Sequence, residues 1–506
     1  MWLSILVLYF CWYILSIGFI YLLRIKFKYL APPIFFSFVA ATYMTVTGEN
    51  IEYEVYASIN NTNASEALEL LLSSMFLLPF TFVFLFFLLT YKYLLTDKVA
   101  LNKKPYLSKN NSLILIIIAS IGLLYSYIYQ RGALYLSYPL NIPYFQKMYL
   151  TEFYFFKKRF SQVKYKLPVD VVSKEGDAVY VLVIGESARK HSMSVYGYLR
   201  DTTPNMKMNI VKNKSKSFVF DAISSGIATR LSVPMLLSTI NTKNYNKLSL
   251  EPSLIHVFNA LNYKTTLISN QETSGRNNDI ISLMFGDIRN KYYINDESVS
   301  NEKLNWSYDI DLIPYLENSI NGENKKDFII IHLMGSHWDY SRRYPENFSI
   351  FNDGRVGSYD NSIRYTDHVI GKLIEQINAS HRPVALIYTS DHGANLNDTG
   401  DGNYLHAVKE MTEFEVKVPF LITFNDRFVK ENSDKVINIF KNNNKKVSHD
   451  NIAYTFLGLA GLYDPSIYKK EYDLSSDWFE ETARYAINRR REVVDVDKYL
   501  SEKFRK

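Results

Sequence analysis

The sequence is nearly free of cysteine. Its one cysteine, Cys11, lies inside an apolar run at the start of the chain, so the later, polar part can form no disulfide and no thiolate metal site. Long apolar runs are absent after about residue 160. The net charge is +6, but no compact stripe of lysine and arginine is present, which argues against nucleic-acid binding.

The chain is long and unevenly composed. Its 506 residues, 47% of them hydrophobic and 15% aromatic, exceed one ordinary domain and exclude a disordered protein. The apolar runs are concentrated in the first part and the polar sequence in the rest. We therefore predict a transmembrane helical domain at 1–130, an interfacial juxtamembrane linker at 131–168 and a polar globular domain at 169–506.

Four apolar segments approach the ~20 residues that a helical membrane span requires. They lie at residues 2–23, 30–46, 71–91 and 112–129. The second segment is short and contains Pro32 and Pro33, so a re-entrant or interfacial piece is its alternative interpretation.

The loops between these segments predict their orientation, because cytoplasmic loops retain lysine and arginine. The first and third loops are basic, whereas the second has no basic residue. The basic residues are Arg24, Lys26 and Lys28, then Lys92, Lys98, Lys103 and Lys104; the second loop carries Glu49, Glu52, Glu54, Glu66 and Glu69. The second loop, the N-terminus and the large domain are therefore expected outside. The N-terminus lacks the features of a cleaved signal peptide.

The linker at 131–168 mixes many aromatic residues with the basic cluster Lys157, Lys158 and Arg159. Aromatic rings suit the lipid headgroup layer and basic side chains suit anionic lipid phosphates. This composition predicts a segment lying along the membrane. Ordinary packing against the domain is the alternative for any single ring.

The remainder of the chain alternates between short apolar runs and helical patterns. The runs at 179–185, 265–269, 328–335, 384–390 and 418–424 are typical of buried strands, and isoleucines recur on one face of a helix at 359–379. This alternation predicts an α/β domain with a mostly parallel sheet covered on both sides.

Acidic residues and histidines follow three of these strands. Glu186 follows the first strand, His332 and His337 lie in or after the third, and Asp391 and His392 follow the fourth. Ligands bind such sheets at the carboxyl ends of the strands. The sequence therefore predicts a metal site at this edge of the sheet.

Six segments resemble successive signature blocks of the phosphoethanolamine transferases, which belong to the alkaline phosphatase and sulfatase superfamily. They lie at 181–206 (with GES), 226–238 (with SVP), 330–345, 359–370, 388–398 (with SDHG) and 448–459 (with SHDN). The resemblance implies a sulfatase-like α/β/α domain after several membrane spans. Members of the family typically have five spans, whereas this chain shows four.

The resemblance also implies residue roles. Glu186, Thr229, Asp391 and His392 would bind the metal, and Thr229, five residues before Pro234, would be the nucleophile. A bound divalent cation favours the alkoxide of a hydroxyl that is otherwise a poor nucleophile. The ligand types suit zinc or manganese, and the resemblance favours zinc.

Further histidines match the family's pattern less closely. His332, His337 and His406 match histidines that surround the phosphoryl group or a second zinc in relatives. His449 is expected to help fix a helix start near Asp450. His191 and His368 are interpreted as structural or exposed.

The expected reaction transfers phosphoethanolamine from phosphatidylethanolamine to a lipopolysaccharide acceptor, a core sugar or lipid A, through a covalent intermediate on threonine. The expected location is the bacterial inner membrane, as a multi-pass protein with its catalytic domain in the periplasm. Two departures from the lipid A-modifying members favour a core sugar: the domain has no cysteine beside the nucleophile motif and carries Met235 just after Pro234, and Arg230 directly follows Thr229. Phosphoglycerol transfer, hydrolysis, transfer to periplasmic glucans and a non-catalytic scaffold are the alternatives.

Overall fold

The computed structural model describes most of the polar part of the chain. The described residues are 52–61, 141–166, 168, 177–271, 280–295, 307–398, 400, 404–408 and 410–503, with scattered positions between 77 and 121. The first two predicted spans, and most of the other two, lie outside these residues. In the part that the structure describes, no helix is both long enough and apolar enough to cross a membrane. The chain divides into two compact units, Met1–Glu152 and Phe153–Lys506.

In the first unit, helix α3 (Tyr53–Asn61) packs against the start of α8 (Ile142–Phe160). Tyr53, Ala57, Phe145 and Tyr149 form the buried contact, and the Tyr53 hydroxyl donates to the Glu152 carboxylate at 2.5 Å. The predicted acidic loop is therefore partly helical here.

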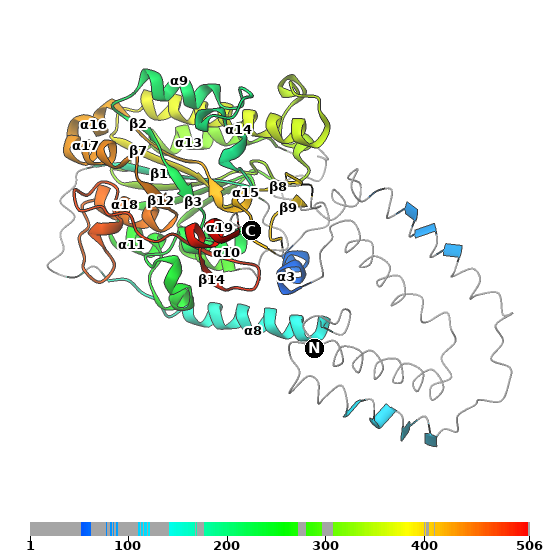
Figure 1. Cartoon of the computed structure of the whole chain (residues 1–506). Helices are drawn as coiled ribbons and strands as arrows, with labels where there is room; N and C mark the ends of the chain where they lie inside the picture. Colours follow the sequence, from blue (N-terminus) through cyan, green and yellow to red (C-terminus); the bar gives the residue numbers. More distant parts are fainter. Residues whose placement is uncertain are drawn as a thin grey trace. The chain divides into compact units, whose positions relative to one another are not determined.

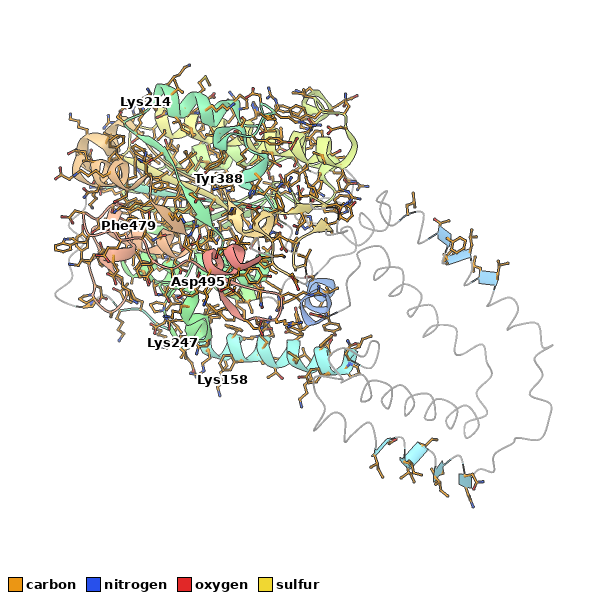
Figure 2. The ribbon with its side chains drawn as sticks, viewed as in Figure 1. Lys158, Lys214, Lys247, Tyr388, Phe479 and Asp495 are labelled. Carbon is orange, nitrogen blue, oxygen red and sulfur yellow. The ribbon has the colours of Figure 1, made fainter. Side chains whose placement is uncertain are left out.

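The second unit begins with the end of α8, whose two faces differ. Phe156 and Phe160 are buried in the main core, whereas Lys157, Lys158 and Arg159 are exposed. Lys158 is labelled on the surface of this helix in Figure 2. Some rings of the linker therefore pack into the domain, as the alternative interpretation expected, and others are exposed beside the basic cluster.

A seven-stranded sheet forms the centre of the second unit (Figure 1), in the order β2-β11-β7-β1-β6-β4-β5. Its strands are β1 (Val179–Gly185), β2 (Ser217–Val219), β4 (Lys264–Ser269), β5 (Asn290–Tyr293), β6 (Asp327–His332), β7 (Val384–Ser390) and β11 (Phe420–Phe424). The five strands from β7 to β5 are parallel, while β11 runs antiparallel to β7 and β2 antiparallel to β11. The prediction of a mostly parallel sheet is confirmed.

Two predicted strands end differently in the structure. The run predicted as a strand at 328–335 stops at His332, because the chain turns at Gly335, where φ is +52°. The run at 418–424 is divided between β10 (Lys417–Val418) and β11, because Pro419 between them has no N–H for a ladder hydrogen bond.

Helices cover both faces of the sheet. Figure 1 shows α9 (Pro204–Lys212), α13 (Ile313–Ile320) and α14 (Gly354–Ala379) on one side, and α10 (Thr229–Leu236), α11 (Leu254–Ala260) and α18 (Asp450–Leu459) on the other. Alternate residues of β1 point to opposite faces. Val179, Val181 and Val183 pack in one core, and Tyr180, Leu182 and Ile184 in the other. The domain is thus a three-layer α/β/α fold.

Shorter elements surround these layers. They are α12 (Ile280–Met284), α15 (Glu413–Val416), α16 (Asp426–Glu431), α17 (Ser433–Asn442) and α19 (Val496–Lys503), with the strands β3 (Asp221–Ile223), β12 (Lys446–Ser448), β8 (Asn395–Leu396), β9 (Tyr404–Leu405), β13 (Tyr485–Ile487) and β14 (Val493–Asp495). Tyr388 of β7, labelled in Figure 2, is fully buried between the layers.

Candidate active site

Glu186 follows β1 at the carboxyl edge of the sheet and is 1% exposed. The next residue, Ser187, has a positive φ of 55°, and its hydroxyl donates to Glu186 Oε1 at 2.8 Å. Gly335 lies against the backbone of Glu186, so closely that a Cβ at this glycine would stand 2.8 Å from the Glu186 nitrogen and oxygen. The turn that presents Glu186 is therefore held from both sides.

Asp391 follows β7, the neighbour of β1, and its two carboxylate oxygens have different surroundings. Oδ1 accepts hydrogen bonds from the backbone N–H of His392 at 2.7 Å and of Ser187 at 3.0 Å. Oδ2 is buried and has no hydrogen-bond partner among the residues that the structure describes. A buried carboxylate oxygen of this kind is costly unless a cation or a donor satisfies it.

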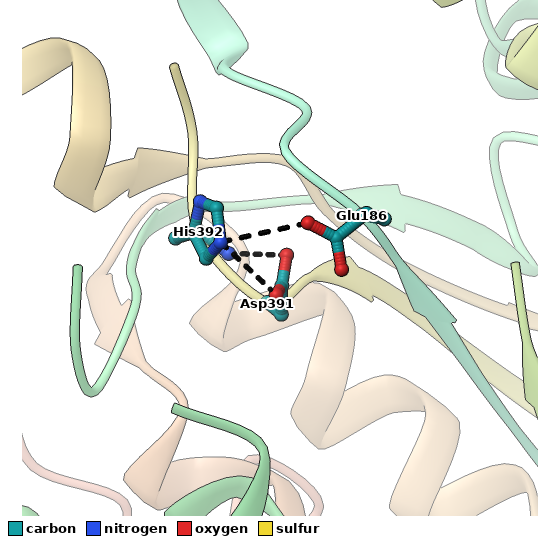
Figure 3. Close-up of side chains that lie close together, drawn as sticks. All are labelled: Glu186, Asp391 and His392. Atoms are coloured by element: carbon teal, nitrogen blue, oxygen red, sulfur yellow. Dashed lines mark hydrogen bonds and ion pairs between the residues drawn. The ribbon is translucent and has the colours of Figure 1, made fainter. Parts of the chain in front are cut away.

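His392 completes the cluster (Figure 3). Its Nδ1 lies 2.8 Å from the carbonyl oxygen of Gly393, which can only accept, so Nδ1 carries the proton and donates. The other nitrogen, Nε2, therefore offers a lone pair. It lies 3.5 Å from Glu186 Oε1 and 3.3 Å from Asp391 Oδ2.

These three side chains fit a divalent cation. Glu186, Asp391 and His392 each offer a ligand atom, all within 4.8 Å of one another, and all three side chains are buried. Two carboxylate oxygens and one neutral imidazole are a donor set that zinc accepts. The unpartnered Oδ2 of Asp391 and the inward lone pair of His392 are the observations that support the fit.

Thr229 is the first residue of α10 and is partly exposed, unlike the three side chains beneath it. Its Oγ1 lies 3.3 Å from Glu186 Oε2 and 3.3 Å from His392 Nε2. The structure therefore brings together all four residues that the sequence singled out. A group bound at Thr229 also faces the start of a helix, where the backbone N–H groups favour negative charge.

The three outer histidines stand at different places around this cluster. The ring of His406 lies 4.2 Å from that of His392, centre to centre, and burial, with His392 and His337 nearby, holds its pKa well below the usual value. His337 is partly buried and follows β6 by five residues. His332 ends β6 opposite Ile184 of β1, which places it at the same sheet edge, where its ring contacts Phe285.

His449 has a role that the sequence did not reveal. It precedes α18 as expected, but its side chain makes no cap; Asp450 instead accepts from the backbone and hydroxyl of Thr242. The buried ring of His449 donates from Nε2 to the Ser390 carbonyl at 3.0 Å, and burial lowers its pKa to about 4. His449 thus supports the strand end that carries Asp391.

We expect Gly335→Ala to destabilise the protein and to weaken metal binding together. The new Cβ would meet the Glu186 backbone at 2.8 Å in a left-handed conformation, with an expected cost of about 3 kcal/mol. Gly197→Ala is the matched control, because Gly197 also has a positive φ but no atom lies within 4 Å of its Cβ position. Urea unfolding and zinc titration of both variants test the prediction. Equal losses of stability and of zinc affinity in Gly335→Ala and Gly197→Ala would contradict it.

The model of the family described as Sulfatase matches residues 178–462, more than half of the chain. The chain belongs to the sulfatase family. This sulfatase-family chain is 28% identical to the phosphoethanolamine transferase EptC of Escherichia coli K12 over an alignment of 339 residues, which covers 63% of this chain and 57% of that protein. The matched region thus spans little more than half the length of that relative.

Two solved structures are similar to this sulfatase-family chain. The periplasmic domain of Escherichia coli EptC in complex with Zn superposes with a TM-score of 0.59 at 27% identity, covering 66% of this chain and 97% of that domain. The integral membrane protein EptA of Neisseria meningitidis gives a TM-score of 0.69 at 21% identity, covering 90% of this chain and 88% of that one. The second likeness concerns the fold alone.

Proposed function

We propose that this chain is a metal-dependent phosphoethanolamine transferase that moves the headgroup of phosphatidylethanolamine to a lipopolysaccharide acceptor. The observation that carries the proposal is the position of Thr229 Oγ1, which is 3.3 Å from both Glu186 Oε2 and His392 Nε2. This places the hydroxyl directly beside the buried cluster of Glu186, Asp391 and His392. The identity with EptC over 339 residues supports phosphoethanolamine as the transferred group.

The proposed reaction has two steps, both at the phosphorus of the donor. Thr229 Oγ1 bonds to the phosphorus of the donor, the bond from that phosphorus to the glycerol oxygen breaks, and the threonine proton leaves with diacylglycerol. An acceptor hydroxyl or phosphate oxygen then attacks the same phosphorus, and the bond from that phosphorus to Thr229 Oγ1 breaks. Oγ1 takes up the proton that the attacking group loses, or a proton from water when the attacking group carries none. Glu186 orients the Thr229 hydroxyl by accepting its hydrogen bond. A cation held by Glu186, Thr229, Asp391 and His392 would favour the alkoxide form of the hydroxyl that it contacts.

Zinc is the proposed cation. Its support is the mixed carboxylate and imidazole ligand set and the zinc complex of the EptC domain. The comparisons give no support for manganese. His406, His337 and His332 are proposed to surround the phosphoryl group or to hold a second zinc, and the neutral state that burial gives His406 suits either role.

We also propose that residues 1–130 cross the inner membrane four times, that 131–168 lie along it, and that 169–506 form the periplasmic catalytic domain. Basic first and third loops and the acidic second loop support this orientation. A reporter that is active only in the periplasm should be active when fused after residue 170 and inactive when fused near residue 100. The reverse pattern would exclude a lipopolysaccharide acceptor on the outer leaflet.

Mass spectrometry of envelope glycolipids from cells with and without the protein tests the function directly. We expect a phosphoethanolamine increment on lipopolysaccharide, with a core sugar favoured over lipid A because Arg230 and Met235 replace the usual neighbours of the nucleophile. Increments on lipid A phosphates alone would refute the core-sugar preference. A phosphoglycerol increment, or one on periplasmic glucans, would favour the alternative reactions instead.

A further inference from the structure

One arginine, Arg355, lies beside both loops that carry the outer histidines. It is in the first turn of α14 and partly buried. Its guanidinium carbon lies 4.0 Å from the ring centre of Tyr404 and 5.2 Å from that of Trp338. Trp338 directly follows His337, and Tyr404 precedes His406 by two residues. Arg355 therefore contacts the loop that carries His337 and the loop that carries His406.

These contacts place Arg355 near the reacting group. The His406 ring lies 4.2 Å from the His392 ring, and His392 Nε2 lies 3.3 Å from Thr229 Oγ1. Tyr404, which Arg355 contacts, is therefore two residues in sequence from a histidine whose ring lies beside a neighbour of the proposed nucleophile. A large acceptor whose hydroxyl reaches Thr229 would extend past the loops that Arg355 contacts.

The guanidinium of Arg355 forms no ion pair with any carboxylate that the structure describes. Asp353, two residues earlier, binds Arg200 instead, at 2.6 Å. The Asp339 carboxylate accepts from the backbone N–H of Ser341 at 3.2 Å. No carboxylate in the described part of the chain neutralises Arg355, so its positive charge can attract an anionic ligand.

The stability of the fold does not explain this position. A cation in the first turn of a helix opposes the helix dipole, which is an energetic cost to the fold. Contact with two aromatic rings offsets part of this cost by cation–π attraction. Stacking uses the face of the guanidinium and leaves N–H groups on its edge, which match a phosphate or carboxylate through paired hydrogen bonds.

We propose that Arg355, oriented by Trp338 and Tyr404, binds an oxyanion of the acceptor, a phosphate or a sugar carboxylate. The inference rests on the proposed function. The donor is excluded as the ligand by its charges: its single phosphate occupies the site at Thr229, and its remaining charge is an ammonium group, which Arg355 repels. Arg355 then determines which acceptors are used and takes no part in the formation of the covalent intermediate.

The two half-reactions test this separately in the full-length, zinc-loaded protein in detergent. With phosphatidylethanolamine alone, Arg355→Gln should form the Thr229 adduct at the wild-type rate. With purified lipopolysaccharide added, the acceptor KM of Arg355→Gln should rise about tenfold while its kcat stays nearly unchanged. The acceptor KM of Arg355→Lys should lie between those of the wild-type protein and Arg355→Gln. Lys372→Gln is the control, because it removes the same charge from an exposed position on the same helix.

Two lipopolysaccharides that carry two or one phosphates on the diglucosamine distinguish the sources of the anion. A wild-type preference for the doubly phosphorylated acceptor that Arg355→Gln loses identifies phosphate. An equal rise of KM for both acceptors excludes the diglucosamine phosphates and assigns the contact to an anion on the core, a phosphate or a sugar carboxylate. Removal of core phosphate with a phosphatase then separates these two: the KM effect of Arg355→Gln disappears if the anion is phosphate and persists if it is a carboxylate.

Two results would overturn the inference while leaving the proposed function in place. The first is an acceptor KM that Arg355→Gln leaves unchanged. The second is that Arg355→Gln slows adduct formation as much as it slows transfer, which would mean that Arg355 only maintains the shape of the site. If the wild-type protein forms no adduct on Thr229, the proposed function fails and the inference falls with it.

Discussion

Thr229→Ala is expected to lower transfer by about a thousand-fold or more while the domain stays folded. The hydroxyl is the only group at position 229 that can form the covalent adduct, and Glu186 and His392, which contact it, are proposed to act as metal ligands rather than as nucleophiles. Folding should change by less than about 1 kcal/mol, because Thr229 is partly exposed and alanine is a good helix former.

Intact-protein mass spectrometry with phosphatidylethanolamine and no acceptor provides the measurement. The wild-type protein should gain one phosphoethanolamine mass, mapped by peptide sequencing to Thr229, and the alanine variant should gain none. Thr229→Ser is the matched control, since it keeps a hydroxyl at the same place and should still form an adduct. An adduct at another residue, or undiminished transfer by the alanine variant, would refute the covalent mechanism.

The central part of the fold could be predicted from short apolar runs. The predicted strands at 179–185 and 384–390 coincide with β1 and β7, because a strand buried on both faces has a continuous apolar sequence. Glu186 and Asp391 follow these two neighbouring strands directly. Because parallel strands end at one edge, the strand prediction placed both residues at the same edge of the sheet. That β1 and β7 are neighbours, which brings the two residues together, came only from the structure.

Thr229 could not be found in the same way. It begins a helix and does not follow a strand, and no periodicity distinguishes it from Thr202 or Thr203; only the resemblance of the segment around Pro234 identified it. Contacts between distant segments were also missed. Examples are the bond from the His449 ring to the Ser390 carbonyl, which are 59 residues apart, and the bond from the Gly393 N–H to the Glu415 carbonyl at 2.7 Å.

Other features within each of the two units depend on packing that has no local signal. The burial of Glu52 and Glu54 around α3 was not predicted, since an acidic loop between apolar segments is normally solvated. The antiparallel direction of β11 was likewise absent from the pattern, because a buried strand has the same composition in either direction. Such features are decided by which segments meet after the chain folds.

Asp391→Asn is expected to remove the metal and leave the fold. Oδ1 accepts from the backbone N–H of His392 and Ser187, and the amide oxygen of asparagine can keep both bonds. The change therefore falls on Oδ2, the buried oxygen with no partner among the described residues, where a neutral NH2 group would replace a charged ligand atom. Bound zinc should drop below about a tenth of the wild-type content, and transfer by about a thousand-fold or more.

The measurements are the zinc content of the purified protein, its circular dichroism and its transfer activity. Treatment of the wild-type protein with a chelator should abolish activity, and added zinc should restore it; added zinc should not restore Asp391→Asn. Asp426→Asn, which alters a carboxylate that is 90% exposed, is the control and should match the wild-type protein. The substitution preserves the hydrogen bonds of Oδ1. A loss of activity with an unchanged circular dichroism spectrum would therefore assign the loss to the missing metal ligand at Oδ2. Full zinc content and activity in Asp391→Asn would show that the cluster of Glu186, Asp391 and His392 is not the metal site.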